Sequence, residues 1–330
     1  MNGYLAISIR GTGRALPSRV LTNADFEKMV DTSDEWIRTR TGILERRIVS
    51  DGQSTLTLAV DAARDALADA GMAATDLDLI ICATITPEYP FPATACFMQE
   101  QLGVPDIPAY DISAACSGFV YALISAAHFI HHGTYRNVLV VGAECMSRFT
   151  DYTDRGTCIL FGDGAGAAVI GPAEREDQGM YYCHMGADGK GAATILCPGG
   201  GARTPASRET VDQRLHSLKM NGREVYKFAV TKMQQVIHDA MVAQGLAADD
   251  IAMIIPHQSN LRIIESAREK LGLPAEKVFV NIDRYGNMSG ASVPVALDEV
   301  RKSGVVGAGQ WVLLVAFGAG LTWASALIRT

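Results

Sequence analysis

One cysteine of this chain stands in a setting that favours nucleophilic chemistry. Cys116 lies in the segment AYDISAACSGFVYALISAAHFI, where a short strand ends near Ile112 and passes through small residues into an amphipathic helix. Unpaired N–H groups and the dipole at a helix start favour a thiolate, so we expect a lowered pKa for this thiol. The other six cysteines lack this combination of helix start, small neighbours and glycine. Cys116 is the candidate nucleophile, and the alternative is a buried structural cysteine.

Two polar residues in the second part of the chain are candidates for the same site. His257 directly follows an apolar strand in IIPHQSNLRII, and α/β proteins gather active groups at the carboxyl ends of such strands. Asn287 lies in the glycine-containing loop DRYGNMSGASVPVAL. Each has a simpler explanation, because an isolated histidine is often structural and an asparagine between glycines is often a turn residue.

An internal repeat relates the loop of Asn287 to the loop of Cys116. A shift of 174 residues aligns 65–81 with 239–255, with eight identities in seventeen positions. Each half therefore predicts a helix, a buried strand, a loop, a helix and a buried strand, which is the pattern of an α/β fold. If the halves pack about a pseudo-twofold axis, the three candidate residues converge on one centre.

The repeat also predicts how the chain is divided. We expect an N-terminal half at 1–174, a connecting segment at 175–223, and a C-terminal half at 224–330. The connecting segment is rich in glycine and lacks clear periodicity, so we expect it to form loops. The run GDGAGAAVIG (162–171) lacks the strand-to-helix context of a dinucleotide-binding loop and predicts a tight strand pair.

The composition is that of a globular chain and argues against two classes of partner. Of the 330 residues, 48% are hydrophobic and 20% are charged, and the net charge is −7, which argues against nucleic acid and anionic membranes as partners. The uncharged run 311–328 is interrupted by Gly318 and Gly320, so it predicts two buried strands rather than a membrane span. Seven cysteines without a CxxC pair predict reduced thiols and no zinc site. With no signal-peptide pattern at the start, we expect a cytoplasmic protein.

Over nearly its whole length the chain resembles the 3-oxoacyl-acyl-carrier-protein synthases III, condensing enzymes of the thiolase superfamily. The resemblance implies a thiolase-like, five-layered α-β-α-β-α sandwich of two pseudo-symmetric halves. The motifs that carry it are DTSDEWIRTRTGILERRI (31–48), the cysteine segment, TDRGTCILFGDGAGAAVI (153–170), MNGREVYKFAV (220–230), PHQSNLRII, YGNMSG and FGAGLTWASALI (317–328).

The resemblance also implies a reaction. Cys116 would take an acyl group from a short acyl-coenzyme A, and His257 with Asn287 would hold the thioester oxygen of malonyl-acyl carrier protein. Loss of carbon dioxide would leave an enolate that attacks the acyl-cysteine and starts fatty acid synthesis. Elongating synthases have a second histidine where Asn287 falls, and plant-type polyketide synthases resemble this chain less over its length. No metal and no cofactor are implied beyond the coenzyme A thioester substrate.

Further residue roles follow from the resemblance alone. The backbone N–H groups of Cys116 and Ala319 would form an oxyanion hole, and Ala319 replaces the usual glycine, which could strain the backbone there. Phe91 would reach into the acyl pocket of the partner subunit in a homodimer, or simply pack at the interface. The implied coenzyme A contacts are Trp36, Arg40, Arg155 and Asn260.

Docking of the acidic carrier protein calls for a basic surface on this acidic chain. The implied docking residues are Gln258, Ser259, Asn260, Leu261 and Arg262, together with Lys227, Arg268 and Lys270. The simpler explanation for the docking residues is a charged helix face that is merely solvated. For the residues assigned to coenzyme A, the simpler explanation is that Trp36 caps a surface helix and the arginines form salt bridges.

Two rival functions stay open. One is a specialised relative that loads a longer or branched acyl group, or passes it to a hydroxyl or amine. The other is a non-catalytic subunit that binds carrier protein, which would have no need of the nucleophile Cys116.

Overall fold

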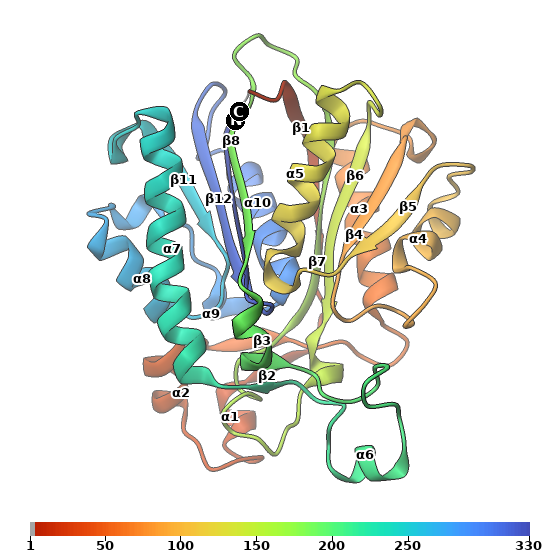
Figure 1. The fold of residues 1–330 in the computed structure, drawn as a ribbon, viewed down its shortest axis with the longest axis vertical. Helices are drawn as coiled ribbons and strands as arrows, with labels where there is room; N and C mark the ends of the chain where they lie inside the picture. Colours follow the sequence, from red (N-terminus) through yellow and green to blue (C-terminus); the bar gives the residue numbers. More distant parts are fainter. Residues whose placement is uncertain (1–3) are drawn as a thin grey trace.

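Two mixed β-sheets form the frame of the molecule (Figure 1), and the computed structural model describes residues 4–330. The first sheet has the strand order β1-β7-β6-β4-β5, in which β4, β5 and β6 run parallel and β7 is antiparallel to β1 and β6. All eight residues of β6 are buried, as expected for an apolar strand with helices on both faces. The strands are β1 (Ile7–Ala15), β4 (Leu79–Ala83), β5 (Ala109–Ile112), β6 (Val138–Cys145) and β7 (Asp163–Pro172).

The second sheet has the order β11-β12-β13-β8, with β11 parallel to β12 and the other pairs antiparallel. The expectation of loops throughout 175–223 is wrong for β8, because that strand hydrogen-bonds along β13 and completes this sheet. The uncharged run 311–328 forms the antiparallel pair of β12 and β13. The strands are β8 (Gly179–Ala187), β11 (Ile251–Pro256), β12 (Trp311–Gly318) and β13 (Thr322–Arg329).

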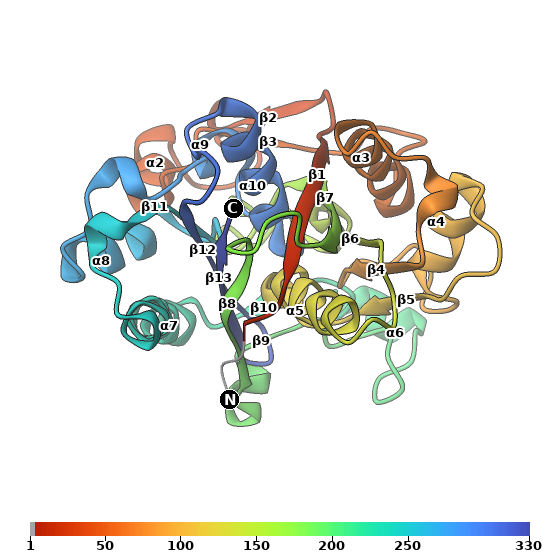
Figure 2. The ribbon, with the colours of Figure 1, turned by 90° about the horizontal axis from the view of Figure 1, so that it is seen from above.

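Helices cover both faces of both sheets and complete five layers (Figure 2). The middle layer, between the sheets, is α5 (Gly118–His131) and α10 (Ser292–Ser303). The outer face of the first sheet is covered by α3 (Thr55–Asp69) and α4 (Thr94–Leu102), and that of the second by α7 (Gly222–Gln244) and α8 (Leu261–Lys270). The predicted α-β-α-β-α sandwich is therefore confirmed. Within residues 4–330, no helix combines the length and the apolar character that a membrane crossing requires.

Short elements gather at one end of the layers, at the bottom of Figure 1. The strands and helices there are β2 (Val20–Thr22), β3 (Glu45–Arg47), α1 (Asn23–Phe26), α2 (Asp34–Thr41), α6 (Arg208–Asp212) and α9 (Ile282–Tyr285), with the strand pair β9 (Ile195–Leu196) and β10 (Lys219–Met220). Seven 3₁₀ turns complete the described chain: η1 (Ala74–Asp76), η2 (Ala115–Ser117), η3 (Met146–Phe149), η4 (Gly189–Thr194), η5 (Ala248–Asp250), η6 (Ala275–Lys277) and η7 (Ser289–Ala291).

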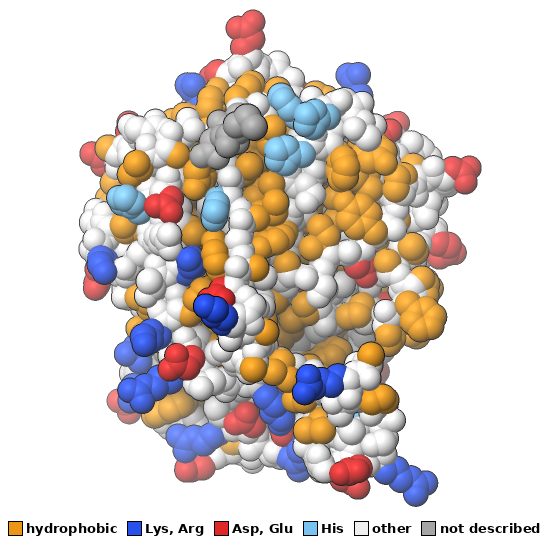
Figure 3. Space-filling model, in the orientation of Figure 1, with side chains coloured by type: hydrophobic (Ala, Val, Ile, Leu, Met, Phe, Trp, Pro, Cys, Tyr) orange, Lys and Arg blue, Asp and Glu red, His pale blue; other side chains and the backbone are white. Residues whose placement is uncertain are grey.

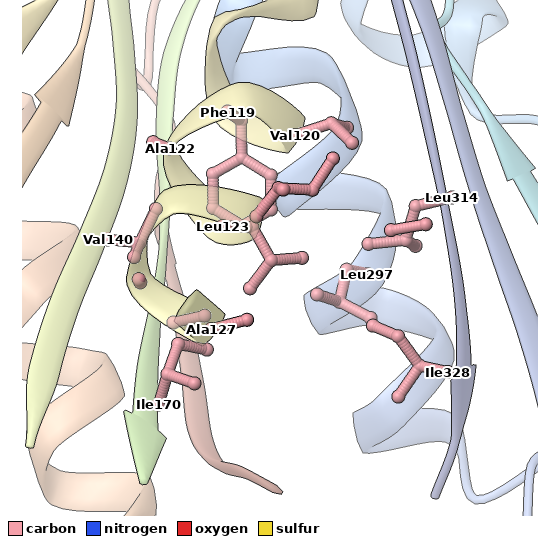
Figure 4. Close-up of a cluster of buried hydrophobic side chains, with 14 of the residues drawn as sticks. Phe119, Val120, Ala122, Leu123, Ala127, Val140, Ile170, Leu297, Leu314 and Ile328 are labelled. Atoms are coloured by element: carbon pink, nitrogen blue, oxygen red, sulfur yellow. The ribbon is translucent and has the colours of Figure 1, made fainter. Parts of the chain in front are cut away.

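The largest hydrophobic cluster fills the space between the two sheets (Figure 4). Phe119 and Leu123 of α5 meet Leu297 of α10, and Leu314 and Ile328 close the cluster from the second sheet. Each of these side chains is at least 95% buried, which stabilises the fold by roughly 1.5–3 kcal/mol apiece. The helices that follow the candidate catalytic loops are therefore fixed against both sheets.

The repeat found in the sequence reappears in the elements of the middle layer. Turn η7 begins 174 residues after η2, and α10 begins 174 residues after α5. Ala115 and Ser289 open the two turns with the same unusual backbone conformation, since φ is 48° at both. The two turns are thus equivalent pieces of backbone, and they lie directly before the two central helices.

Candidate active site

A cavity of about 240 Å³ contains all three candidate catalytic residues in its wall. Cys116 follows β5, His257 follows β11, and Asn287 lies between α9 and α10. The structure thus brings together three residues from distant loops, as the repeat predicted, while their chemical roles stay a prediction. Much of the remaining wall is apolar and includes Ile85, Met146, Phe161, Leu218, Ile263 and Phe317.

Cys116 lies in turn η2, at the point where this turn leads into α5. The end of β12 passes very close to it: a Cβ atom added at Gly318 would lie 2.7 Å from the Cys116 amide nitrogen. Only a glycine permits this approach, because real side chains do not tolerate such a contact. The expected position of the thiol at a helix start is therefore found, with backbone from the other half beside it.

The thiol of Cys116 has a raised pKa, so the expectation of a lowered pKa is wrong for this site. Burial raises the pKa of Cys116 to about 12, because a thiolate in this position loses its hydration. The hydrogen bond with Ser289 opposes the rise, and the charge of Glu144 adds to it. The sulfur donates to Ser289 Oγ at 3.6 Å. Forming the thiolate here requires a group that takes the proton.

His257 is a neutral imidazole held at the end of β11. Its backbone N–H donates to Val315 O at 2.7 Å, and its ring meets Phe317 edge-on at 5.6 Å between centroids. The residue is 1% exposed, and burial lowers its pKa to about 3. Its Nδ1 has no hydrogen-bond partner among residues 4–330. At neutral pH this ring can donate a hydrogen bond but carries no charge.

Asn287 is held on both sides by the chain that precedes β7. Its N–H donates to Leu160 O at 2.9 Å, and its carbonyl oxygen accepts from Gly162 N at 3.1 Å. Its side-chain Oδ1 accepts from Ser289 N at 2.8 Å. Because the amide oxygen is occupied in this way, the NH₂ group is the part left to donate into the cavity.

A buried arginine backs the loop of Asn287. Arg46 is fully buried, and Cβ atoms added at Gly162 or Gly286 would lie 3.1 or 3.2 Å from its Cβ. Its guanidinium donates to Asn23 Oδ1 at 2.7 Å and to Ile159 O, and it lies 4.4 Å from the centroid of the Phe26 ring. Burial lowers the pKa of Arg46 to about 10, so it remains a cation at neutral pH. Both glycines are required by backbone contacts beside Arg46, because Cβ atoms added at Gly162 and Gly286 would lie 2.3 Å from Tyr285 O and 2.9 Å from Leu160 O.

His257 and Asn287 have the chemistry needed to stabilise a developing oxyanion. A neutral imidazole and a carboxamide donate hydrogen bonds without needing a proton transfer, and preorganised donors of this kind stabilise negative charge in a dry site. Within residues 4–330, no group of three or more His, Cys, Asp and Glu side chains has the arrangement of a metal site.

Ala319 follows β12 and lines the same cavity. The non-glycine residues with positive φ within the described range 4–330 are Asp106, Ala115, Arg214 and Ser289. Ala319 is therefore not strained in the way that its replacement of the usual glycine suggested. A second cavity of about 340 Å³ lies next to the first and shares wall residues with it, among them Ala319, Ile85, Met146 and Leu218.

The mouth of the cavity carries the residues expected to bind coenzyme A. Trp36, Arg40 and Asn260 line it, and the Arg155 guanidinium lies 5.1 Å from the centroid of the Trp36 ring. Asn260 also has a local task, because its Oδ1 caps α8 through Arg262 N and its Nδ2 donates to Arg40 O. One N–H of this amide is left for a ligand.

The docking set predicted from the resemblance is only partly on the surface. Gln258 is fully buried, and its side chain makes four hydrogen bonds: to the carbonyls of Pro256 and Phe279 and from the N–H groups of Asn281 and Ile282. Gln258 is therefore not a docking residue, and its amide instead joins β11 to the chain before α9.

The remaining docking candidates differ in whether their side chains are exposed to solvent or already engaged in contacts within the chain. Leu261 packs against Gly42, and Arg268 is paired with Glu265 at 2.6 Å. Ser259 lines the cavity. Among these docking candidates, the exposed cations are Lys227 on α7 and Arg262 and Lys270 on α8.

Phe91 is the most exposed large hydrophobic residue in the described chain, at 85%, and Tyr89 beside it is 54% exposed. Both lie in the loop between β4 and α4. Hydrophobic side chains gather on the same side of the molecule, over α5 and β5 (Figure 3). Strand β5 is the last in its sheet, so its outer edge has no partner strand within residues 4–330.

Two residues of the site were missed in the sequence. Ser289 contacts the Cys116 sulfur, and Glu144 is a fully buried carboxyl group at the end of β6. The repeat could have indicated both residues, because the 174-residue shift matches them with neighbours of the predicted oxyanion-hole residues. Ser289 is matched with Ala115, beside Cys116, and Glu144 with Gly318, beside Ala319.

Comparison with known proteins agrees with this geometry. Residues 110–189 match the family model described as 3-oxoacyl-[acyl-carrier-protein (ACP)] synthase III, and residues 241–330 match the model of its C terminal part. The chain is 53% identical over 325 residues to the beta-ketoacyl-[acyl-carrier-protein] synthase III of Caldanaerobacter subterraneus subsp. tengcongensis, covering 98% of each. It is 50% identical over 322 residues to that of Roseiflexus castenholzii, covering 98% of this chain and 97% of the relative.

A solved structure shows the same similarity in three dimensions. The crystal structure of 3-oxoacyl-[acyl-carrier-protein] synthase III from Aquifex aeolicus VF5 superimposes with a TM-score of 0.90 at 46% identity. The match covers 98% of this chain and 100% of that one. The chain therefore belongs to the 3-oxoacyl-acyl-carrier-protein synthase III family of condensing acyltransferases.

Proposed function

We propose that this chain is a β-ketoacyl-acyl carrier protein synthase III. It joins the acyl group of a short acyl-coenzyme A to malonyl-acyl carrier protein, releases carbon dioxide and coenzyme A, and so initiates fatty acid synthesis. The observation that carries the proposal is the meeting of a thiol and two neutral hydrogen-bond donors, from Cys116, His257 and Asn287, in the wall of one cavity.

In the first half-reaction the Cys116 thiolate attacks the carbonyl carbon of the acyl thioester. A new C–S bond forms, and the bond from the carbonyl carbon to the coenzyme A sulfur breaks. The tetrahedral oxyanion in between needs donors, and the backbone N–H groups of Cys116 and Ala319 are suited to this role. The approach of Gly318 to the Cys116 amide supports a shared location for the two N–H groups.

In the second half-reaction the malonyl group loses carbon dioxide. The bond between its carboxylate and C2 breaks, and the electron pair becomes an enolate that His257 and Asn287 stabilise by donating hydrogen bonds to the thioester oxygen. The low pKa of His257 supports this role, because a neutral imidazole donates over the whole physiological pH range. The enolate carbon then attacks the acyl-cysteine and expels the Cys116 thiolate.

A Cys116→Ala variant is expected to lose acyl-enzyme formation completely, because no other group in the cavity can form the thioester. Mass spectrometry of the intact protein after exposure to acetyl-coenzyme A measures this directly. Cys183→Ala, which removes a half-buried cysteine on β8, is the matched control and is expected to be acylated like the parent chain. An acyl mass on the Cys116→Ala variant would show that the nucleophile is a different residue.

Asn287→Ala and Asn287→Asp are both expected to spare acylation and to slow decarboxylation by about 100-fold, the usual effect of losing one oxyanion donor. The aspartate variant keeps an acceptor for Ser289 N but has no N–H to donate. Release of labelled carbon dioxide from malonyl-acyl carrier protein measures the second step, and labelled acyl transfer to the protein measures the first. Equal losses in the two steps would contradict the role given to Asn287.

Two surfaces near the cavity mouth serve the two substrates. We assign the adenine end of coenzyme A to Trp36 and Arg155, the phosphate region to Arg40 and the pantetheine arm to Asn260. The stacked tryptophan–arginine pair and the exposed cation support this assignment, because a nucleotide tail offers an aromatic ring and phosphate charge. The acidic carrier protein docks on the neighbouring cations, of which Lys227, Arg262 and Lys270 are exposed.

Two variants, one on each surface, test whether coenzyme A and the carrier protein bind at separate surfaces. Arg262→Glu is expected to raise the KM for malonyl-acyl carrier protein about tenfold with little change for acyl-coenzyme A, because it reverses one docking charge. Trp36→Ala is expected to do the opposite, because it removes the aromatic surface assigned to the adenine and no docking charge. Steady-state kinetics with each substrate varied in turn give both KM values. If each variant raises both KM values equally, the surfaces are not separate.

We further propose that the chain acts as a homodimer. Its supports are the exposed Phe91, the apolar surface over α5 and β5 (Figure 3), and the unpaired outer edge of β5, which a second copy can extend as a continuous sheet. In this arrangement Phe91 enters the acyl pocket of the partner.

A Phe91→Asp variant is expected to raise the dissociation constant of the dimer about tenfold or more, because an aspartate cannot replace a buried aromatic anchor. Sedimentation velocity over a concentration series measures this constant. Val242→Asp, which alters another well-exposed apolar residue on α7, is the matched control and leaves the dimer intact. A monomeric parent chain, or equal effects of the two variants, would exclude this interface.

A longer or branched acyl group is the second candidate substrate. It is favoured by the second cavity of about 340 Å³ beyond Ala319, whose apolar wall has room for more than an acetyl group. Intact-mass measurements with a panel of acyl-coenzymes A distinguish the two. We place the reaction in the cytoplasm, where the seven free cysteines are stable as thiols, and we assign it no cofactor besides the coenzyme A substrate.

A further inference from the structure

Glu144 is a buried carboxyl group near the candidate site, and it has no role in the reaction steps described so far. It is the last residue but one of strand β6 and is fully buried. Its Oε2 accepts hydrogen bonds from the N–H groups of Ile85 and Thr86 and from the hydroxyls of Thr84 and Thr86, and its Oε1 accepts from Gly290 N at 3.3 Å. So many donors hold one carboxyl group in a single orientation.

Ser289 lies between this carboxyl group and the nucleophile. The Cys116 sulfur donates to Ser289 Oγ at 3.6 Å, and the residue after the serine, Gly290, donates its N–H to Glu144 Oε1 at 3.3 Å. The serine itself is fixed, because its N–H donates to Asn287 Oδ1 at 2.8 Å. Turn η7 therefore contacts the sulfur through Ser289 Oγ and the carboxyl group through Gly290 N, and the Ser289 side chain is close enough to Glu144 to oppose the rise of its pKa.

The repeat shows that the fold does not require an acid at this strand end. The 174-residue shift pairs Cys116 with Gly290 and Glu144 with Gly318. At the end of β12, Gly318 lies against the Cys116 amide without a side chain; at the equivalent end of β6, Glu144 accepts a hydrogen bond from the Gly290 amide. The same backbone is thus built once with a glycine and once with a carboxyl group, and the carboxyl group contacts the turn whose Ser289 accepts from the thiol.

We propose that Glu144, acting through Ser289, accepts the proton of Cys116 when the thiolate forms. The thiol proton passes to Ser289 Oγ while the serine proton passes to the carboxylate, which leaves a thiolate and a carboxylic acid. The proton stays on Glu144 during acylation and decarboxylation and returns by the same path when the condensation expels Cys116. The departing coenzyme A sulfur takes its proton from solvent, which supplies the one proton that the overall reaction consumes.

Other groups of the site are poorly suited to this task. His257 has a pKa of about 3 and is a very weak base, whereas burial raises the pKa of Glu144 to about 7 against the effect of its donors. A carboxyl group that has taken up the proton is also neutral while the enolate and the oxyanions form nearby, so it does not repel them. This role rests on the function proposed above, since it concerns the same thiol.

The titratable groups around Glu144 leave it free to change its charge alone near neutral pH. Those that interact with it are the thiols of Cys82 on β4, Cys116 in η2 and Cys145 on β6. Burial raises the pKa of all three, so they are protonated at pH 7.

The test measures the reactivity of the thiol without any substrate, so it is independent of the proposed function. Iodoacetamide alkylates thiolates, and peptide mass spectrometry reports the alkylation rate of Cys116 alone between pH 5 and 10. The main variant is Ser289→Ala, which removes only the connecting hydroxyl. It is expected to fold, because the equivalent Ala115 already has the same φ of 48°. Ser325→Ala, a buried serine on β13 whose hydroxyl has no partner among residues 4–330, is the matched control.

The parent chain is expected to react with a rate that rises through about pH 7, as Glu144 ionises. Ser289→Ala is expected to react about 100-fold more slowly at pH 7.5, the usual contribution of a positioned base, and to lose this pH dependence, whereas Ser325→Ala reacts like the parent. The Glu144→Gln variant distinguishes a proton-accepting carboxylate from one that only repels the thiolate, because the two roles change the alkylation rate in opposite directions. Loss of a proton acceptor slows the reaction, but loss of a merely repelling charge lowers the thiol pKa and speeds it.

A Ser289→Ala variant that keeps the parent rate and pH dependence would overturn the proposal, and so would a faster Glu144→Gln variant. If Glu144→Gln does not fold, the Ser289→Ala result decides alone. Failure of the parent chain to form an acyl-enzyme, with the alkylation result unchanged, would reject the proposed function and leave the proton path intact.

Discussion

The contact between two pieces of backbone, turn η2 from one half and turn η7 from the other, is the constraint on which the site depends. The turns meet where β6 and β12 end, and each strand needs a glycine to approach the turn of the other half: a Cβ added at Gly142 would lie 2.3 Å from Gly290 O, and one at Gly318 would lie 2.7 Å from the Cys116 amide nitrogen. The nucleophile is therefore fixed by main chain on two sides. The five layers of the fold hold these two turns together.

Removal of water sets the charge state of each group in this site. Burial keeps Cys116 as a thiol and His257 as a neutral ring, and it brings the pKa of Glu144 close to neutrality. A neutral site suits a reaction in which negative charge appears only in short-lived intermediates. The same burial makes a free thiolate costly, which is why the route of its proton matters.

Much of this arrangement was predictable from the sequence, because a duplicated chain with one unusual cysteine limits where the centre can lie. The five layers and the convergence of Cys116, His257 and Asn287 follow from periodicity, the repeat and the family motifs. The parts that could not be predicted depend on contacts between distant segments. Gln258 stands in a polar motif yet is buried by the chain before α9, and the meaning of Glu144 appears only when the other half is packed against it.

The buried cation at Arg46 links the mouth of the cavity to its interior. Arg46 follows α2, the helix that carries Trp36, and its guanidinium binds Asn23 and Ile159 O behind the loop of Asn287. A desolvated charge with such partners is tolerated only while all of them stay in place. A change that removes one of these partners is therefore expected to loosen both the segment that carries Trp36 and the loop that carries Asn287.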